Sequence, residues 1–258
     1  MKGPAGVVCL VLGELVAGGV ILLFATPLWR EVKRGFFKVA GIVLLTLAIA
    51  AWRSGAAGLV EGSDAGAWSV RLAGALSALT LVWVLLLFVR RHAAARAMGI
   101  ASAPFSVVML GAMAGTAEGS ALVGFLQLLA GAAFLGAVMD GLLLGHWYLT
   151  DRGLSRTPID RYTTFLIVAV VLEAAAVITG GFGPTTDSSS FNPLLTSAGL
   201  ASWIALGMVG TTALIAVLIR AALRGTRSSA VQAATGFFYL AVITAFTAEL
   251  AAKVRFLP

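Results

Sequence analysis

The sequence predicts an all-α fold, a polytopic transmembrane helical bundle of about eight spans with both termini outside. Of its 258 residues, 60% are hydrophobic and 11% are charged, whereas an average soluble domain is about 45–50% apolar and about 25% charged. The mean hydropathy is +1.00. A soluble globule of this composition would expose large apolar patches, which soluble monomers avoid. The chain is therefore expected to lie in a membrane.

Eight apolar segments, most of them near the roughly 17–25 residues that a membrane span requires, follow one another along the chain. In order they cover 6–29, 37–52, 71–89, 100–117, 121–149, 162–181, 198–219 and 231–252. The first resembles a signal peptide, but Glu14 interrupts its apolar core and the apolar character continues to about residue 29. It is therefore predicted to be a span. The second is short and its ends are the least sharply defined.

Tryptophan and basic residues mark the span ends and give the orientation. Five tryptophans lie near proposed ends, where an indole prefers the membrane interface: Trp29, Trp52, Trp68, Trp147 and Trp203. The connectors after the odd-numbered spans hold 13 of the 18 Lys and Arg residues: Arg30, Lys33, Arg34, Lys38, Arg90, Arg91, Arg96, Arg152, Arg156, Arg161, Arg220, Arg224 and Arg227. The positive-inside rule places these connectors in the cytoplasm, which leaves both termini outside.

The chain is predicted to form a single integral membrane domain, 1–258, and is compatible with a 4 + 4 helix arrangement of 1–118 and 119–258. The first and fifth spans both end in an aromatic, basic connector, ATPLWREVKRG and LLGHWYLTDRG. Glycines spaced by four residues, Gly111, Gly115 and Gly119 and also Gly141 and Gly145, predict close approach of neighbouring helices.

Composition also excludes several function classes. The net charge of +7 and the isoelectric point near 10.3 come from the short connectors, so nucleic acid is not an expected partner. The single cysteine, Cys9, allows no internal disulfide. No Cys/His pattern typical of a zinc, iron–sulfur or covalent haem site is present, and a bis-histidine haem is not expected because one histidine lies within a span. No metal site is predicted in this chain.

Ionisable side chains within spans are the best functional candidates, because each costs about 2.5–3.5 kcal/mol to insert. Asp140 and Glu173 have no basic residue at matching depth, which predicts protonated carboxyl groups and a proton-relay role. Glu14 is either a ligand or a hydrogen-bonding group between helices. Glu249 precedes Lys253 by four residues, which predicts an ion pair at the membrane edge worth only about 0.3–0.5 kcal/mol.

The histidines differ in their surroundings. His146 lies in GHWYLT, one turn inside the cytoplasmic end of the fifth span, beside Tyr148. An imidazole there can donate a hydrogen bond to a quinone carbonyl or bind a lipid headgroup. His146, Glu14 and Tyr148 are therefore the candidate quinone or ligand residues, and no catalytic residue is assigned. His92, in RRHAAAR, is expected to be an interfacial residue.

Eight spans, both termini outside and a first span rich in small residues, LGELVAGGVILL, resemble the membrane anchors of polysulfide and dimethyl-sulfoxide reductases, the NrfD/DmsC type. This resemblance implies a subunit that binds quinone near the outer face, carries no metal and passes electrons to an iron–sulfur partner. It favours Glu14 over His146 as the quinone ligand.

Three functions remain open at this stage. The first is an integral membrane subunit of a respiratory electron-transfer complex in the cytoplasmic membrane, which interacts with quinone and anchors redox partner subunits. The second is a proton-coupled small-molecule transporter, which the buried acids and glycine-rich spans favour. The third is a structural or assembly subunit of a membrane complex. Whether the chain is itself an enzyme is left open, and membrane lipids and other protein subunits are the expected partners.

Overall fold

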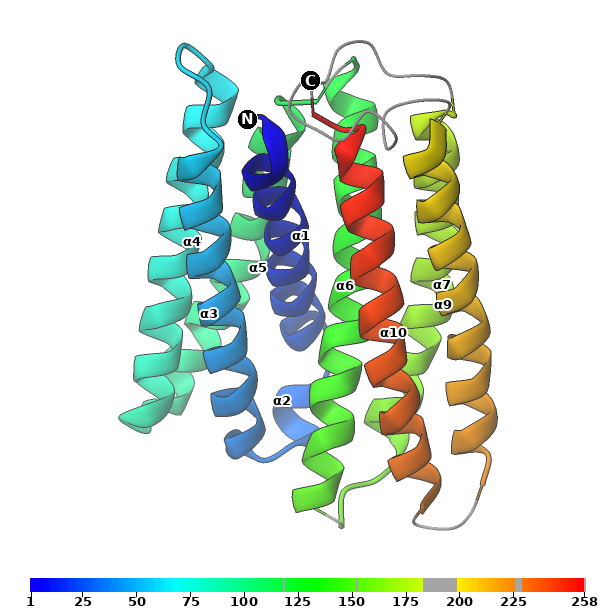
Figure 1. Ribbon diagram of the computed structural model, residues 1–258. Coiled ribbons are helices and arrows are strands. Elements are labelled where there is room, and N and C mark those ends of the chain that lie inside the picture. The colour runs from blue at the N-terminus through cyan, green and yellow to red at the C-terminus, as the bar shows by residue number, and fades with distance from the viewer. Residues whose placement is uncertain (118, 152, 183–198, 226–228, 258) are drawn as a thin grey trace.

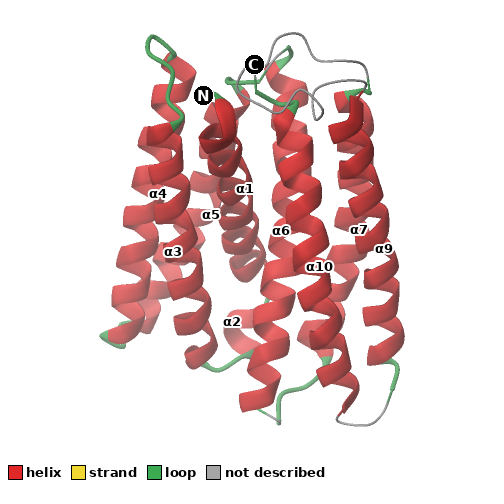
Figure 2. Ribbon diagram, viewed as in Figure 1, coloured by secondary structure: helices red, strands yellow, loops and turns green. Residues whose placement is uncertain are grey.

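The computed structural model describes residues 1–258 except 118, 152, 183–198, 226–228 and 258. The described residues form helices joined by loops and turns and contain no strand (Figure 2). In chain order the helices are α1 (Gly3–Ala25), α2 (Leu28–Glu31), α3 (Arg34–Ala57), α4 (Asp64–Phe88), α5 (His92–Ala114), α6 (Ala121–Thr150), α7 (Thr157–Gly180), α9 (Leu200–Leu223) and α10 (Ser229–Val254). All except α2 are long and apolar enough to span a membrane. The predicted polytopic helical bundle is confirmed.

Several helices begin earlier than predicted, most clearly α5, which starts at His92 rather than at residue 100. The first two predicted spans also end at other residues than expected. The first span was expected to continue to Trp29, but α1 ends at Ala25 and Thr26 adopts an extended conformation. Because Pro27 follows, the helical region is disfavoured at Thr26, and the chain resumes as the short α2. The second span is longer than predicted, since α3 continues past Trp52 to Ala57.

The two ends of the bundle differ in charge. Figure 1 shows both termini at one end, together with the connections that follow α3 and α5. We call this the terminal end. The connections that follow α1, α4, α6 and α9 lie at the opposite end, which we call the basic end because the described residues of the predicted basic connectors lie there. Two predicted basic residues, Arg152 and Arg227, lie outside the described residues. The alternation of basic and less basic connectors therefore matches the alternating direction of the helices.

This arrangement predicts the membrane topology. Reporter fusions after Arg34, Arg91, Arg156 and Arg224, all at or near the basic end, are expected to report a cytoplasmic location. A fusion after Gly62, in the turn between α3 and α4, is the matched control and should report the opposite side. A non-cytoplasmic signal at two of the four basic positions would overturn the topology.

The long helices pack as two groups of four (Figure 1). The first group contains α1, α3, α4 and α5, and the second contains α6, α7, α9 and α10. The groups meet mainly where α1 packs against α6. Within its most apolar 18-residue window α1 is 72% buried, against 56% for α6 and 33–39% for the others, so these two helices form the centre of the bundle. Internal duplication stays a prediction.

The contact between α1 and α6 depends on glycine. A Cβ atom on Gly18 would lie 1.7 Å from the carbonyl oxygen of Ala132, and one on Gly136 would lie 2.4 Å from the carbonyl carbon of Gly18. The two backbones therefore touch, which only glycine allows.

The glycine pattern predicted from the sequence is correct in part. Gly141 and Gly145 face Phe238 and Thr235 of α10 at close range, as expected for tight helix packing. The prediction is wrong for Gly111 and Gly119. A Cβ on Gly111 would have its nearest neighbour at 4.0 Å, and one on Gly119 would meet nothing within 4 Å.

Ion pairs join the two groups at the basic end. Arg161 of α7 donates two hydrogen bonds of 2.9 Å to the Glu31 carboxylate of α2, and these bonds lower the pKa of Glu31. Lys33 lies 3.0 Å from Asp151, which follows α6. The segment between α1 and α3 is therefore joined by ion pairs to Asp151 at the start of the α6–α7 connection and to Arg161 in the first turns of α7.

Candidate functional site

A buried group of charged side chains, the ionic cluster, lies in the half of the bundle nearer the terminal end. It consists of Glu14 of α1, Glu173 of α7, and Glu249 and Lys253 of α10. The Lys253 ammonium lies 2.8 Å from Glu14 Oε1 and 2.8 Å from Glu249 Oε2. All four residues are buried, none more than 2% exposed. Glu173 interacts electrostatically with the other three.

A glycine on α6 makes room for the cluster. A Cβ atom at Gly131 would lie 2.5 Å from Glu14 Oε1 and 3.0 Å from Glu249 Oε1. Four helices, α1, α6, α7 and α10, therefore enclose the cluster, and any larger residue on α6 would push the carboxylates apart.

The charges of the cluster do not balance if every group is ionised. Three carboxylates and one ammonium would leave a net charge of −2 in a site removed from water. Among the described residues, Glu14 Oε2, Glu173 Oε2 and Glu249 Oε1 have no hydrogen-bond partner. Burying uncompensated charge is expensive. The cluster can therefore hold additional positive charge. Protons supply this charge without needing more space, whereas a larger cation would need room in the site.

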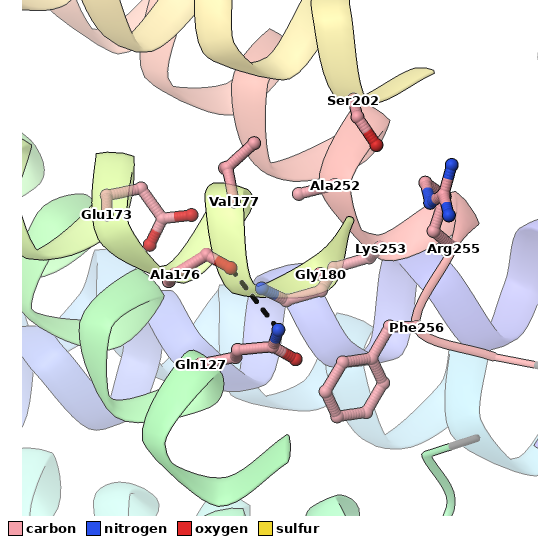
Figure 3. Close-up of a pocket in the computed structure, with 10 residues that line it drawn as sticks. All are labelled: Gln127, Glu173, Ala176, Val177, Gly180, Ser202, Ala252, Lys253, Arg255 and Phe256. Atoms are coloured by element: carbon pink, nitrogen blue, oxygen red, sulfur yellow. Dashed lines mark hydrogen bonds between the residues drawn. The ribbon is translucent and has the colours of Figure 1, made fainter. Parts of the chain in front are cut away.

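A small pocket lies between the cluster and the residues at the terminal ends of α7 and α10; Figure 3 shows the residues that line it. It has a volume of about 40 Å³ and is lined by Gln127, Glu173, Ala176, Val177, Gly180, Ser202, Ala252, Lys253, Arg255 and Phe256. About 10–15 Å³ of such volume suffices for one water molecule, so a few waters fit. Gly180 is the last residue of α7 and Glu173 lies seven residues deeper, about 10 Å along the helix. Water in this pocket would reach from the helix ends to the carboxyl group.

A wider apolar groove adjoins the pocket on the outer surface of α6 and α7. Its volume is about 390 Å³, and its lining is Val123, Leu126, Gln127, Leu129, Ala130, Leu172, Ala175, Ala176 and Thr179. Leu126 and Leu172 are exposed, so the groove faces the lipid. Gln127 and Ala176 line both the groove and the pocket. The Gln127 amide donates to the Ala176 carbonyl at 3.2 Å and to Thr179 at 3.3 Å.

One expectation about charge is wrong, and a second is correct only in part. Glu173 was expected to have no basic neighbour, but Lys253 lies in the same cluster. The predicted pair of Glu249 with Lys253 is confirmed at 2.8 Å, but it is buried rather than placed at the membrane edge. The physical reason is that Phe256 and Leu257, which follow α10, are themselves buried at 6% and 3% exposure and cover this end of the helix.

Asp140 lies apart from the cluster. It is fully buried and accepts a hydrogen bond of 3.3 Å from the Tyr162 hydroxyl. Nine residues of α6 separate it from Gly131, which corresponds to about 13 Å along the helix, and Gly136 lies between them. The structure thus does not bring the two predicted proton-relay residues, Asp140 and Glu173, together.

The three predicted quinone ligands are also dispersed. His146 is exposed near the basic end, where its Nδ1 lies 2.9 Å from the Tyr239 hydroxyl. Tyr148 is buried and its hydroxyl donates to the Ser155 carbonyl. Glu14 belongs to the ionic cluster on the other side of the glycine contact. A quinone role for each residue stays a prediction, and the three cannot act as one site.

Several residues of interest were missed by the sequence reasoning. Gln127 is a polar amide within the fifth predicted span, and that position was a usable signal. Lys253 was noticed only as a partner of Glu249. Tyr162 and Gly131 carry no signal in the sequence, because their importance comes from contacts with other helices.

Comparison with known proteins adds no relative. No protein-family model, no curated protein and no solved structure matches this chain.

Proposed function

We propose that the chain is the quinone-interacting membrane subunit of a respiratory electron-transfer complex in the cytoplasmic membrane. The observation that carries the proposal is the adjacency of three features: a lipid-facing apolar groove, a small polar pocket and a buried ionic cluster, linked by Gln127 and Glu173. A quinone requires each of them, because its ring and tail are apolar, its oxygens form hydrogen bonds, and its reduction or oxidation moves protons.

Oxidation of a quinol releases two electrons and two protons. In this proposal the ring of the quinol enters the groove from the lipid, and one of its hydroxyl groups donates a hydrogen bond to the side-chain oxygen of Gln127. The Gln127 amide nitrogen already donates to Ala176 and Thr179. Glu173 accepts the two protons one after the other and passes each to water in the pocket, while Lys253 stabilises the ionised carboxylates. The two electrons go to a redox centre in a partner subunit that this chain anchors. Reduction of a quinone runs the same steps in reverse.

The location of the groove favours the terminal end over the end that holds His146 and Tyr148. His146 is already bonded to Tyr239, and the Tyr148 hydroxyl is bonded to a loop carbonyl. Glu14 is the one predicted quinone ligand at the favoured end. In this proposal it does not contact the quinone but holds Lys253 in place by their ion pair.

The test measures quinone in the gently purified assembly. Gln127→Leu is expected to lower the retained quinone about twofold to tenfold, the effect of one lost hydrogen bond of about 0.5–1.5 kcal/mol. Glu173→Gln is expected to retain quinone but to lose most quinol-dependent electron transfer.

The chain offers matched controls. Gln232→Leu changes an exposed glutamine on α10, and Glu61→Gln changes an exposed carboxylate in a loop. Both should leave quinone content and electron transfer unchanged. Loss of quinone in His146→Ala but not in Gln127→Leu would move the site to the basic end, and absence of quinone from every active preparation would refute the proposal.

A proton-coupled transporter is the second candidate. One observation favours it, namely that the pocket brings water to a buried cluster that holds exchangeable charge. Under this alternative, vesicles containing the purified chain would accumulate a solute in response to a pH gradient without any redox partner. A purely structural subunit would show neither activity.

A further inference from the structure

A second polar site occupies the opposite half of the bundle and has no role in the function proposed above. Asp140 and Tyr162 are both fully buried, and Tyr162 donates to Asp140 Oδ2. Asp140 Oδ1 has no hydrogen-bond partner among the described residues. A carboxylate with one unpartnered oxygen and no described counter-charge is costly to bury, whereas the protonated acid is neutral. The natural ligand of this site is therefore a proton.

The surroundings of Asp140 leave Tyr162 as its titratable neighbour. The carboxyl group interacts with Tyr162 of α7. The Gly19 position of α1 lies beside Asp140 Oδ1, with Leu44 of α3 also next to Gly19. Phe238 of α10 packs against the adjacent Gly141. Arg161 interacts electrostatically with the Tyr162 hydroxyl.

The site lies toward the basic end. Tyr162 is five residues after Thr157, the first residue of α7, about 8 Å along the helix, and Thr26 contributes a hydroxyl to its surroundings. Thr26 follows the last residue of α1, where Ala25 and Pro27 are exposed although most of α1 is buried. The early end of α1 thus places Thr26, next to Tyr162, between two exposed residues of the basic end, Ala25 and Pro27.

The glycine contact separates this site from the ionic cluster. Gly18 and Gly136 lie between the two carboxyl sites along α1 and α6, and their backbones leave no space even for a methyl group. Water cannot pass through such a contact.

We propose that Asp140 and Tyr162 form a second proton-binding site that exchanges protons with the basic end, while the ionic cluster exchanges protons with the terminal end. The Gly18–Gly136 contact isolates the two sites from each other. Tyr162 stabilises the ionised form of Asp140 by its hydrogen bond. Binding of a proton to the carboxylate converts it to the neutral acid. This inference does not depend on quinone binding.

The experiment follows protonated carboxyl groups by infrared spectroscopy in sealed vesicles of known orientation. The C=O stretching band that Asp140→Asn removes belongs to Asp140, and the band that Glu173→Gln removes belongs to the cluster. With impermeant buffers, a rise in pH at the basic end is expected to abolish the Asp140 band and to leave the Glu173 band intact. A rise in pH at the terminal end should do the reverse.

Tyr162→Phe keeps Asp140 in place and protects the test if Asp140→Asn does not fold. Without this hydrogen bond the ionised carboxylate is less stable, so the pH at which the Asp140 band disappears should rise by about one unit. Tyr239→Phe, which removes the hydroxyl bonded to His146, is the matched control and should cause no shift. An Asp140 band that follows the pH at the terminal end, or that responds to neither side, would overturn the inference. Because no quinone is involved, its failure is separate from failure of the proposed function.

Discussion

Replacing Lys253 by methionine is expected to cause one of the largest losses of stability in the chain, about 3–5 kcal/mol. The substitution preserves most of the side-chain volume but leaves Glu14 and Glu249, both paired with Lys253 at 2.8 Å, buried without their cation. Unfolding of the purified protein in detergent, followed by circular dichroism, measures the effect.

Two further variants make this result specific. Lys2→Met removes an exposed lysine near the same end and should leave the unfolding transition in place. The triple variant Lys253→Met, Glu14→Gln, Glu249→Gln also removes the two carboxylates that pair with Lys253 and should recover much of the lost stability. A Lys253→Met protein as stable as the original would show that the carboxyl groups are neutral without the lysine.

Gly18→Ala is expected to destabilise the bundle by about 3 kcal/mol or more, at the upper end of the usual cost of overpacking. The added methyl group would lie 1.7 Å from a backbone oxygen of α6, so no side chain can move to relieve the clash. The two central helices would have to separate.

The control for Gly18→Ala is Gly207→Ala on α9, where a Cβ would meet nothing within 4 Å. Alanine has the better helix propensity by about 1 kcal/mol, so this variant should be neutral or slightly stabilising. If both variants unfold at the same denaturant concentration, α1 and α6 do not pack as closely as described.

The membrane fold was predictable because it depends on long apolar segments, and each of these can be recognised without knowledge of the others. The termini of single helices were less predictable, as the early end of α1 before Pro27 shows. The burial of single side chains near helix ends was the least predictable property. Lys253 looks peripheral from its place near the end of the chain, but it is buried because the residues after α10 cover it.

The ionic cluster could be predicted only as separate residues. Glu14, Glu173 and Glu249 each stood out as acids in apolar segments, but nothing in the sequence indicates that three different helices bring them to one lysine. The same limit applies to Gly18 and Gly136. Gly18 and Gly136 lie on different helices, so their contact produces no repeated glycine spacing along either helix that the sequence could reveal.

The ion pairs between the two helix groups have a mechanical consequence. Glu31–Arg161 and Lys33–Asp151 fasten the groups at the basic end, and Glu14–Lys253 fastens them at the terminal end. Carriers that work by rocking one half against the other must open at each face in turn. Here the terminal end could open only after the Glu14–Lys253 pair breaks, and the basic end only after both Glu31–Arg161 and Lys33–Asp151 break. Of these pairs only Glu14–Lys253 is buried, so protonation of Glu14 would weaken the joint between the two groups at the terminal end more than at the basic end.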